Sequence, residues 1–387
     1  MTSALSRRGF MGLTGAVAIG GTAAFSGASA VSAKPEQAAT GDLHYGPAPG
    51  VAKLNANENP YGPSPGALAA MVDACSMGAY YAGGSPVTAR LKSMISERFA
   101  LPAAQVSLSA GSSGVLTYFA AAKAKEGKIL GPDLFWDTTT RAALRQGGEL
   151  TRTPATSDLS VDLDALYDAI TPEVSLVQIC NPNNPTGMIA DATKLRDFCI
   201  RASKKCTVLI DEAYNEITDN PDGNSMIPLI REGHDVVIAR TFSKIFGLAG
   251  MRIGYMLASE ANTAKIARYS LGDYALNQAG VAAAVASFND GEFLSFSKER
   301  ILQARGVITD AARANGLSVA PSQTSFVYVN LGEINAETFR REMAKQNVLI
   351  RGIYQDYTGW SRVSCGRLEH VQQYAAAMPR ALESIIG

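Results

Sequence analysis

The sequence from Arg240 to Tyr255 reads RTFSKIFGLAGMRIGY and begins at the last residue of the β-branched run DVVIAR. Such a run is typical of a strand that is buried on both faces of a parallel sheet. In such sheets, ligands bind just beyond the carboxyl ends of the strands. Lys244 follows the strand, so it stands where a ligand is expected. Desolvation lowers the pKa of a lysine amine there, which makes it a nucleophile able to form a Schiff base.

Two other apolar runs end in polar motifs. SLVQIC continues into NPNNPTG, residues 181–187, and CTVLI continues into DEAY, residues 211–214. Because neighbouring parallel strands end at the same edge of a sheet, we expect Asn184, Asp211 and Lys244 to lie close together. Pyridoxal phosphate requires a lysine for its aldehyde, an acid at its ring nitrogen, and amide or cationic donors for its phosphate. The three strand ends supply candidates for each.

Together with LNANENPYG (residues 54–62) and SRVSCG (residues 361–366), these motifs resemble the fold-type I aminotransferases of the class I and II superfamily. Within it the sequence is most similar to the histidinol-phosphate aminotransferase branch, from about Val51 to the C-terminus. The resemblance implies an α/β fold, with a large domain of mostly parallel sheet flanked by helices and a smaller α+β C-terminal domain. It also implies pyridoxal 5′-phosphate as the cofactor, small amino-acid and 2-oxo-acid substrates, and a homodimer.

The resemblance assigns chemical roles to the strand-end residues. Lys244 would form the Schiff base and, once displaced by substrate, move a proton as a base. Asp211 would pair with the protonated ring nitrogen and keep the ring an electron acceptor. Asn184 and Tyr214 would hydrogen-bond the ring oxygen. Catalysis is therefore assigned to Lys244, Asp211 and Tyr214.

The cofactor phosphate is expected at a helix start. Gly111, Ser112 and Ser113 follow the strand-like QVSLSA and begin a helical pattern. A helix N-terminus with free N–H groups binds anions. An ordinary Ser N-cap would use the same residues. By resemblance, Ser243 and Arg252 would also hold the phosphate, the arginine through a charge-assisted hydrogen bond.

Two aromatic positions follow from the resemblance alone. The family stacks a ring on the pyridine, and spacing from Gly147 favours Trp136 for this role, with Phe135 as the alternative. The family also has a Tyr in an Arg-Tyr-Pro that reaches the phosphate of the neighbouring subunit. Tyr81 is the best match, although Ala82 replaces the proline.

Four residues are candidates for binding the substrate. Arg362 matches the arginine with which the family binds the substrate α-carboxylate in a bidentate manner. Arg351, in VLIRG, is a candidate for a distal anionic group, with a solvated surface arginine as the alternative. Asn59 and Tyr61 lie in the segment that crosses the active site in the family. For both, a surface turn is the alternative.

The N-terminal region differs from the rest of the chain. SRRGFM, with Arg7 and Arg8, precedes a mildly apolar Gly- and Ala-rich run and two small-residue cleavage sites, which resembles a twin-arginine export signal. We therefore divide the chain into a signal (1–33), a linker (34–50), an N-terminal segment with the large domain (51–270) and a small domain (271–387). The expected location is outside the cytoplasm, in the periplasm, without stable membrane insertion. The alternative is a disordered basic N-terminus on a cytoplasmic protein.

Composition excludes several classes of protein. The chain of 387 residues has 35 basic and 35 acidic side chains, which leaves no electrostatic footprint for nucleic acid. Its three histidines are far apart, so neither a metal site nor a His-based triad is expected. Its five cysteines are read as small buried residues, although export would permit a bridge between Cys199 and Cys206.

Other functions compete with transamination. A decarboxylase, racemase or lyase on the same scaffold would use the same cofactor motifs, because the cofactor supplies the shared chemistry. A non-catalytic binding protein would not need the intact Lys244. A nucleotide-binding protein is expected to carry a Gly-rich phosphate loop at a strand–helix junction, and the sequence has none of the usual pattern.

Overall fold

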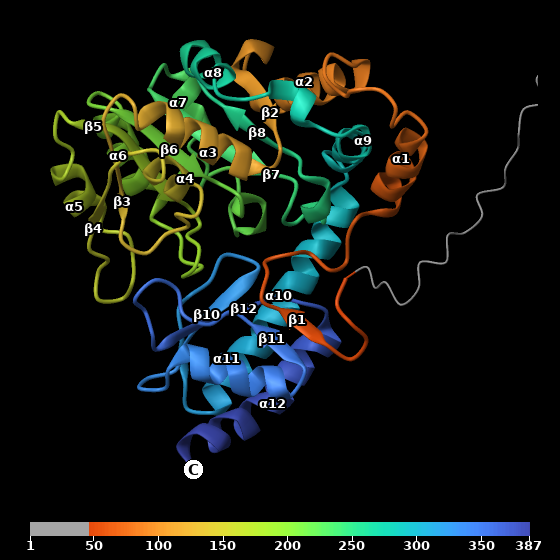
Figure 1. The fold of residues 1–387 in the computed structure, drawn as a ribbon, viewed down its shortest axis with the longest axis vertical. Coiled ribbons are helices and arrows are strands. Elements are labelled where there is room, and N and C mark those ends of the chain that lie inside the picture. Colours follow the sequence, from red (N-terminus) through yellow and green to blue (C-terminus); the bar gives the residue numbers. More distant parts are fainter. Residues whose placement is uncertain (1–45) are drawn as a thin grey trace, which may run out of the picture. The chain divides into compact units, whose positions relative to one another are not determined.

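A seven-stranded sheet contains the three strands that lead into the polar motifs (Figure 1). The computed structural model describes residues 46–387, so the predicted signal and most of the predicted linker lie outside the described residues. In spatial order the strands are β2 (Val106–Ser109), β8 (Gly254–Leu257), β7 (Val236–Thr241), β6 (Thr207–Asp211), β5 (Val174–Cys180), β3 (Lys128–Pro132) and β4 (Leu150–Thr153). The β3–β4, β3–β5, β5–β6 and β6–β7 pairs are parallel, whereas β8 is antiparallel to both of its neighbours.

Both faces of this sheet are buried, because successive side chains of each strand point to opposite faces. In β6, Leu209 packs in one apolar cluster, with Phe119 of α3, whereas Val208 and Ile210 pack in the other, with Phe198 of α6. The helices of this part are α2 (Pro86–Phe99), α3 (Ser112–Lys123), α4 (Thr140–Leu144), α5 (Leu163–Asp168), α6 (Ala192–Ala202), α7 (Ile227–Arg231) and α8 (Glu260–Ala267), with the 3-10 turns η1 (Ala103–Gln105), η2 (Asn215–Ile217), η3 (Ala249–Met251) and η4 (Gly272–Ala275).

The C-terminal part has its own small sheet. Strands β12 (Trp360–Ser364), β10 (Phe326–Asn330) and β9 (Ser318–Val319) form it in that order and are antiparallel. Helices α10 (Gly291–Ala314) and α11 (Ala336–Lys345) pack on it, and α12 (Leu368–Ile386) packs on these two helices (Figure 1). Strand β12 brings Arg362 to the side of the large sheet. The predicted α/β architecture is therefore confirmed.

The N-terminal segment contacts both parts of the fold. Strand β1 (Ala52–Leu54) pairs in parallel with β11 (Val348–Ile350), near the C-terminal end of the chain. After it, α1 (Pro65–Cys75) packs on α9 (Gln278–Ser287). The residues between β1 and α1 cross the carboxyl edge of the large sheet, where Asn57 contacts Tyr214. The start of α1 follows the sequence, since Ser64 caps the helix by accepting from the amide of Ala67 at 3.2 Å.

Among the described residues, no helix combines the length and the apolar composition that crossing a membrane requires. Within the same range, no group of three or more His, Cys, Asp or Glu side chains is placed to hold a metal ion. All five cysteines are free thiols, and Cys199 and Cys206 are both buried.

Candidate active site

A cavity of about 470 Å³ opens at the carboxyl ends of β5, β6 and β7. Register explains the convergence, because Cys180 pairs with Asp211 and Asp211 pairs with Ala239 in adjacent strands. The residues that follow these strands therefore meet at one edge. Most of the residues singled out in the sequence line the cavity, namely Ser112, Ser113, Trp136, Asn184, Asp211, Tyr214, Ser243, Lys244, Arg252, Arg351 and Arg362.

Lys244 lies in the cavity with its amine partly desolvated. Its Nζ donates to the carbonyl oxygen of Asn57 at 3.2 Å and lies 5.4 Å from the ring centroid of Tyr214. Burial, reinforced by the charge of Arg362, lowers the pKa of the Lys244 amine to about 8. A substantial fraction of the amine is thus neutral and nucleophilic near neutral pH.

Asp211 is a buried carboxylate that shares the cavity with Lys244 but has no cation in direct contact with it among residues 46–387. Its Oδ1 accepts from the amide of Ala213 at 3.2 Å, and the thiol of Cys180 lies 3.9 Å from Oδ2. Within residues 46–387 it forms no ion pair. Burial raises the pKa of the Asp211 carboxyl to about 7. A protonated ring nitrogen placed against this carboxylate would supply the missing positive charge.

Tyr214 and Asn184 face the same space from neighbouring strand ends. The hydroxyl of Tyr214 accepts from Nδ2 of Asn57 at 2.9 Å, and burial raises the pKa of this hydroxyl, which keeps it protonated. Asn184 is 6 % exposed, and its Oδ1 accepts from Arg362 at 2.7 Å. Its Nδ2 makes no hydrogen bond within residues 46–387 and can donate to a ligand oxygen.

The start of α3 forms an anion-binding cradle with Arg252. In the described chain no side chain caps this helix, and the N–H of Gly114 donates to the carbonyl of Gly111 at 3.1 Å, so the N–H groups of Ser112 and Ser113 are left for a ligand. Arg252 has φ 55° and bonds the hydroxyl of Ser243 at 3.3 Å and the carbonyl of Ala110 at 3.2 Å. Gly111 has φ +72°, and a Cβ there would lie 2.5 Å from the guanidinium of Arg252. Only glycine at position 111 permits this approach.

The two aromatic candidates lie in different environments. Trp136 lines the cavity, whereas Phe135 is fully buried and lies under Arg152, whose guanidinium carbon is 5.3 Å from the ring centroid. Of the two, Trp136 alone is placed to stack on a ring within the cavity.

Arg362 is a buried cation that lacks an acidic partner in the described part of the chain. It is 4 % exposed, and its Nη atoms bond Asn184 and the carbonyl of Asn55, the latter at 3.4 Å. Its Nε is buried without a hydrogen-bond partner. Burial lowers the pKa of this guanidinium, which still remains charged. A buried charge of this kind calls for an anionic ligand.

Several residues singled out in the sequence do not line the cavity. Asn59 bonds the carbonyl of Ile245 at 2.7 Å and the hydroxyl of Ser297 at 2.9 Å, so its amide is used within the chain. The hydroxyl of Tyr61 accepts from the amide of Leu368 at 3.1 Å. Tyr81 is 78 % exposed and packs edge-on against Tyr274.

The cavity also uses residues that sequence reasoning did not assign. Asn55, Asn57 and Glu58 line it from the crossing segment. All three belong to LNANENPYG, the motif in which the sequence analysis assigned roles only to Asn59 and Tyr61. Nothing local in the motif indicates which asparagine contacts Tyr214, because the contact spans 157 positions.

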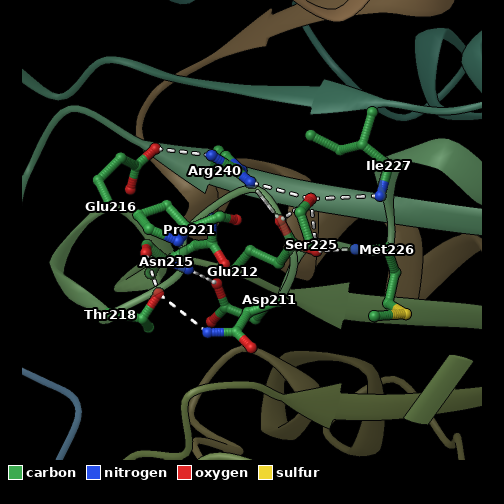
Figure 2. Close-up of polar contacts among 12 residues, drawn as sticks. Asp211, Glu212, Asn215, Glu216, Thr218, Pro221, Ser225, Met226, Ile227 and Arg240 are labelled. Carbon is green, nitrogen blue, oxygen red and sulfur yellow. Dashed lines mark hydrogen bonds and ion pairs between the residues drawn. The ribbon is translucent and has the colours of Figure 1, made fainter. Parts of the chain in front are cut away.

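Another residue that the sequence analysis did not assign, Arg240 in β7, bonds the segment that follows β6. Its guanidinium bonds Glu212 at 2.6 Å and Glu216 at 2.9 Å, and Glu212 also accepts from the hydroxyl of Ser225 and the amide of Met226 (Figure 2). In the sequence, Asp211 directly precedes Glu212, and Tyr214 lies between the two acids. Lys244 is four residues after Arg240. This buried, fully paired network fixes the segments that carry the cavity residues.

Comparison with known proteins identifies the family. The family model described as "Aminotransferase class I and II" matches residues 49–378. The chain belongs to this family. The histidinol-phosphate aminotransferase of Brevibacillus brevis is 30% identical over 321 residues, covering 82% of this chain and 87% of that protein. The aromatic amino acid aminotransferase of Streptomyces avermitilis is 32% identical over 282 residues, covering 73% and 78%.

A solved structure agrees with this assignment. The histidinol-phosphate aminotransferase from Sinorhizobium meliloti, in complex with pyridoxal-5′-phosphate, superposes with a TM-score of 0.79 at 28% identity, covering 86% of this chain and 90% of that one. Class I and II aminotransferases use pyridoxal phosphate, so the chain is a pyridoxal-phosphate-dependent transaminase. The predicted family, fold and cofactor are confirmed.

The residues present fit this cofactor. In the part of the chain that the structure describes, Asp211 has no cation in direct contact, no side chain caps the start of α3, and Gly111 leaves room beside Arg252. Asp211 would hold the ring nitrogen, and Asn184 and Tyr214 the ring oxygen. Ser112, Ser113, Ser243 and Arg252 would hold the phosphate, and Trp136 the ring face.

We predict that covalent uptake of pyridoxal phosphate by the cofactor-free chain accelerates with pH and reaches half of its maximum rate near pH 8, because only the neutral Lys244 amine attacks. Stopped-flow absorbance measures the rate. Lys244→Ala should bind the cofactor without covalent attachment, so borohydride should label no peptide. A pH-independent rate, or labelling of the Lys244→Ala chain, would contradict the assignment.

Asp211→Asn is predicted to retain the fold and bind the cofactor but to lower kcat by about a hundredfold or more, since a buried ion pair is lost. Steady-state kinetics and cofactor titration measure the two effects. Asp168→Asn, at an exposed position at the end of α5, is the matched control and should leave both unchanged. Near-normal turnover in Asp211→Asn would remove Asp211 from its role.

Proposed function

We propose that this chain transfers the amino group of an amino acid, or of an amino alcohol phosphate such as histidinol phosphate, to a 2-oxo acid, with 2-oxoglutarate as the acceptor. The observation that carries the proposal is that the guanidinium of Arg362 is buried in the cavity and has no acidic partner in the described part of the chain. A carboxylate or phosphate of the substrate would provide its counter-charge in a bidentate pair.

Arg351 supports a second anionic group on the substrate. It lines the same cavity, and its backbone amide donates to the carbonyl of Arg362 at 3.1 Å, which ties the two arginines together. Unlike Arg362 it is exposed, and its guanidinium carbon lies 5.7 Å from the ring centroid of Tyr354. An exposed cation at the rim suits the distal carboxylate of 2-oxoglutarate or a phosphate.

The chain's own residues divide the work of the reaction. Bound pyridoxal phosphate supplies an electron sink that stabilises negative charge at the substrate Cα. Lys244 accepts the Cα proton as a base and returns a proton as an acid, for which a pKa near 8 is well suited. Asp211 keeps the ring nitrogen protonated, and Arg362 orients the substrate so that the Cα proton faces Lys244.

The loaded protein should be mixed with single amino donors, including histidinol phosphate, and the loss of the cofactor's visible absorbance recorded before 2-oxoglutarate is added. Transamination predicts loss with a true donor and recovery with the 2-oxo acid. Release of CO2 with no consumption of 2-oxoglutarate would instead favour a decarboxylase on the same scaffold.

Two arginine variants separate the anion sites. Arg362→Met is predicted to lower kcat/KM about a thousandfold for every substrate, because its buried ion pair is lost. Arg351→Met should raise KM for 2-oxoglutarate about tenfold with little change in kcat. Arg341→Met, on the exposed face of α11, is the control. An unchanged KM for 2-oxoglutarate in Arg351→Met would exclude the distal site.

We also propose a homodimer in which Tyr81 contributes to the neighbouring cofactor site. Support comes from exposed apolar side chains around this residue, Val72 at 65 %, Tyr81 at 78 % and Tyr274 at 68 %. They belong to connected elements, because α1 packs on α9 and Gln278 of α9 donates to the carbonyl of Tyr81 at 3.2 Å. Burying such a surface would favour association.

Val72→Glu is therefore predicted to convert a dimer into a monomer with weaker cofactor retention, because a charge would be buried in the interface. Sedimentation velocity and cofactor titration measure these effects. Ile386→Glu, at another exposed apolar position 75 % accessible, should leave the dimer intact. A fully active wild-type monomer would contradict the shared site.

We further propose export by a twin-arginine route, supported by the sequence around Arg7 and Arg8. Cleavage is predicted after Ala30 or Ala33, with the cofactor already bound, since this route carries folded proteins. Replacing both arginines by lysine should retain active enzyme in the cytoplasm. Native protein that begins at Thr2 and is wholly cytoplasmic would show that the signal interpretation is wrong.

A further inference from the structure

Asn57 makes three polar contacts at the centre of the cavity. Its backbone carbonyl accepts from Nζ of Lys244 at 3.2 Å. Its Nδ2 donates to the hydroxyl oxygen of Tyr214 at 2.9 Å, and its Oδ1 accepts from the hydroxyl of Ser364 at 2.6 Å. The side chain is 6 % exposed, so water does not compete freely for these bonds. These contacts connect Asn57 to Lys244, to Tyr214 and to β12.

The side-chain bonds of Asn57 run in one direction. Ser364 donates to the amide oxygen, and the amide nitrogen donates to Tyr214. A tyrosine hydroxyl carries one proton. Because its oxygen here accepts a hydrogen bond from Asn57, its own proton remains available to a different acceptor. If the amide were reversed, Tyr214 would donate to Asn57 and have no proton to give to a ligand.

We propose that Asn57 is a positioning residue for transamination, which holds the Tyr214 hydroxyl as a hydrogen-bond donor directed at the cofactor's ring oxygen. The inference rests on the cofactor role given to Tyr214. Burial, by raising the pKa of Tyr214, keeps the proton in place.

The same strand links this bond chain to substrate binding. Ser364 and Arg362 are two residues apart on β12, so their side chains lie on the same face. Both contact the crossing segment, Ser364 through Asn57 and Arg362 through the carbonyl of Asn55 at 3.4 Å. A shift of β12 would therefore disturb the orientation of Asn57 as well as the position of Arg362.

A donor on the ring oxygen has a measurable electrostatic effect. Such a donor would stabilise negative charge on the ring oxygen. This stabilisation would be larger in the deprotonated form of the loaded protein than in the protonated form. The donor thus lowers the pH midpoint of the visible absorbance band of the loaded protein. The other charged or titratable groups that act on Tyr214 and Lys244 are Asp211, Cys180, Arg362, Arg252 and Glu58, and all are left unchanged in the test.

The experiment is a double-mutant cycle on the loaded protein. Asn57→Asp offers Tyr214 only acceptor oxygens and should turn its proton away from the cofactor. The absorbance midpoint is measured for Asn57→Asp in the wild-type background and in the Tyr214→Phe background. We expect the rise in midpoint to be about one pH unit larger in the wild-type background, the size of one charge-assisted hydrogen bond.

The cycle separates this effect from the added charge. A new carboxylate raises the midpoint in both backgrounds, whereas the loss of the tyrosine donor can occur only where Tyr214 is present. Equal shifts in the two backgrounds would overturn the proposal. Absence of any visible cofactor band in the wild-type protein would refute the proposed function instead, so the two failures are distinguishable.

A second variant decides the question if Asn57→Asp does not hold the cofactor. Leucine in Asn57→Leu is similar in size to asparagine but makes no hydrogen bond to Tyr214, so the direction of the Tyr214 proton is no longer fixed. It should raise the midpoint by about half a pH unit in the wild-type background and by nothing in Tyr214→Phe. Equal shifts here would likewise overturn the proposal. Thermal unfolding of each cofactor-free variant serves as the control for folding.

Discussion

Burial of charge without a partner is the constraint on which this active site depends. Asp211, Lys244 and Arg362 lie in a poorly solvated cavity, and in the described chain Asp211 and Arg362 form no ion pair. Such an arrangement costs folding free energy, because isolated charges are disfavoured in a low dielectric. In the roles proposed above, the cofactor's ring nitrogen would supply the charge complementary to Asp211, and an anionic group of the substrate the charge complementary to Arg362. Binding of the two ligands would relieve this unfavourable burial of charge, and the relief would add to their binding free energy.

The neighbouring network has the opposite arrangement. Arg240 shares its guanidinium between Glu212 and Glu216, and the carboxylate of Glu212 also receives the Ser225 hydroxyl (Figure 2). Its charges are satisfied within the chain, so it has none to offer a ligand. We infer that the paired network gives rigidity to the strand ends. The unpaired residues beside it are then held at fixed positions, as transition-state stabilisation by preorganised groups requires.

The sequence predicted the parts of the site that depend on local pattern. Lys244, Asp211 and Asn184 could be placed together because each follows an apolar strand of a parallel sheet, and the register of those strands confirms it. Asn57 and Arg240 were missed, because their partners depend on how distant segments pack. The preference for Trp136 over Phe135 rested on the resemblance alone, and Trp136 is the one of the two that lines the cavity.

The crossing segment joins the two ends of the chain at the active site. Asn57, near the beginning of the described chain, bonds Ser364, and β1 pairs with β11. During synthesis Asn57 leaves the ribosome long before Ser364, which lies 307 positions later. All strands of the large sheet, the last of which ends at Leu257, are synthesised before β12 is. Lys244 is therefore present in the growing chain before Asn57 and Ser364 can meet, and the cofactor can find the complete site only after β12 has folded.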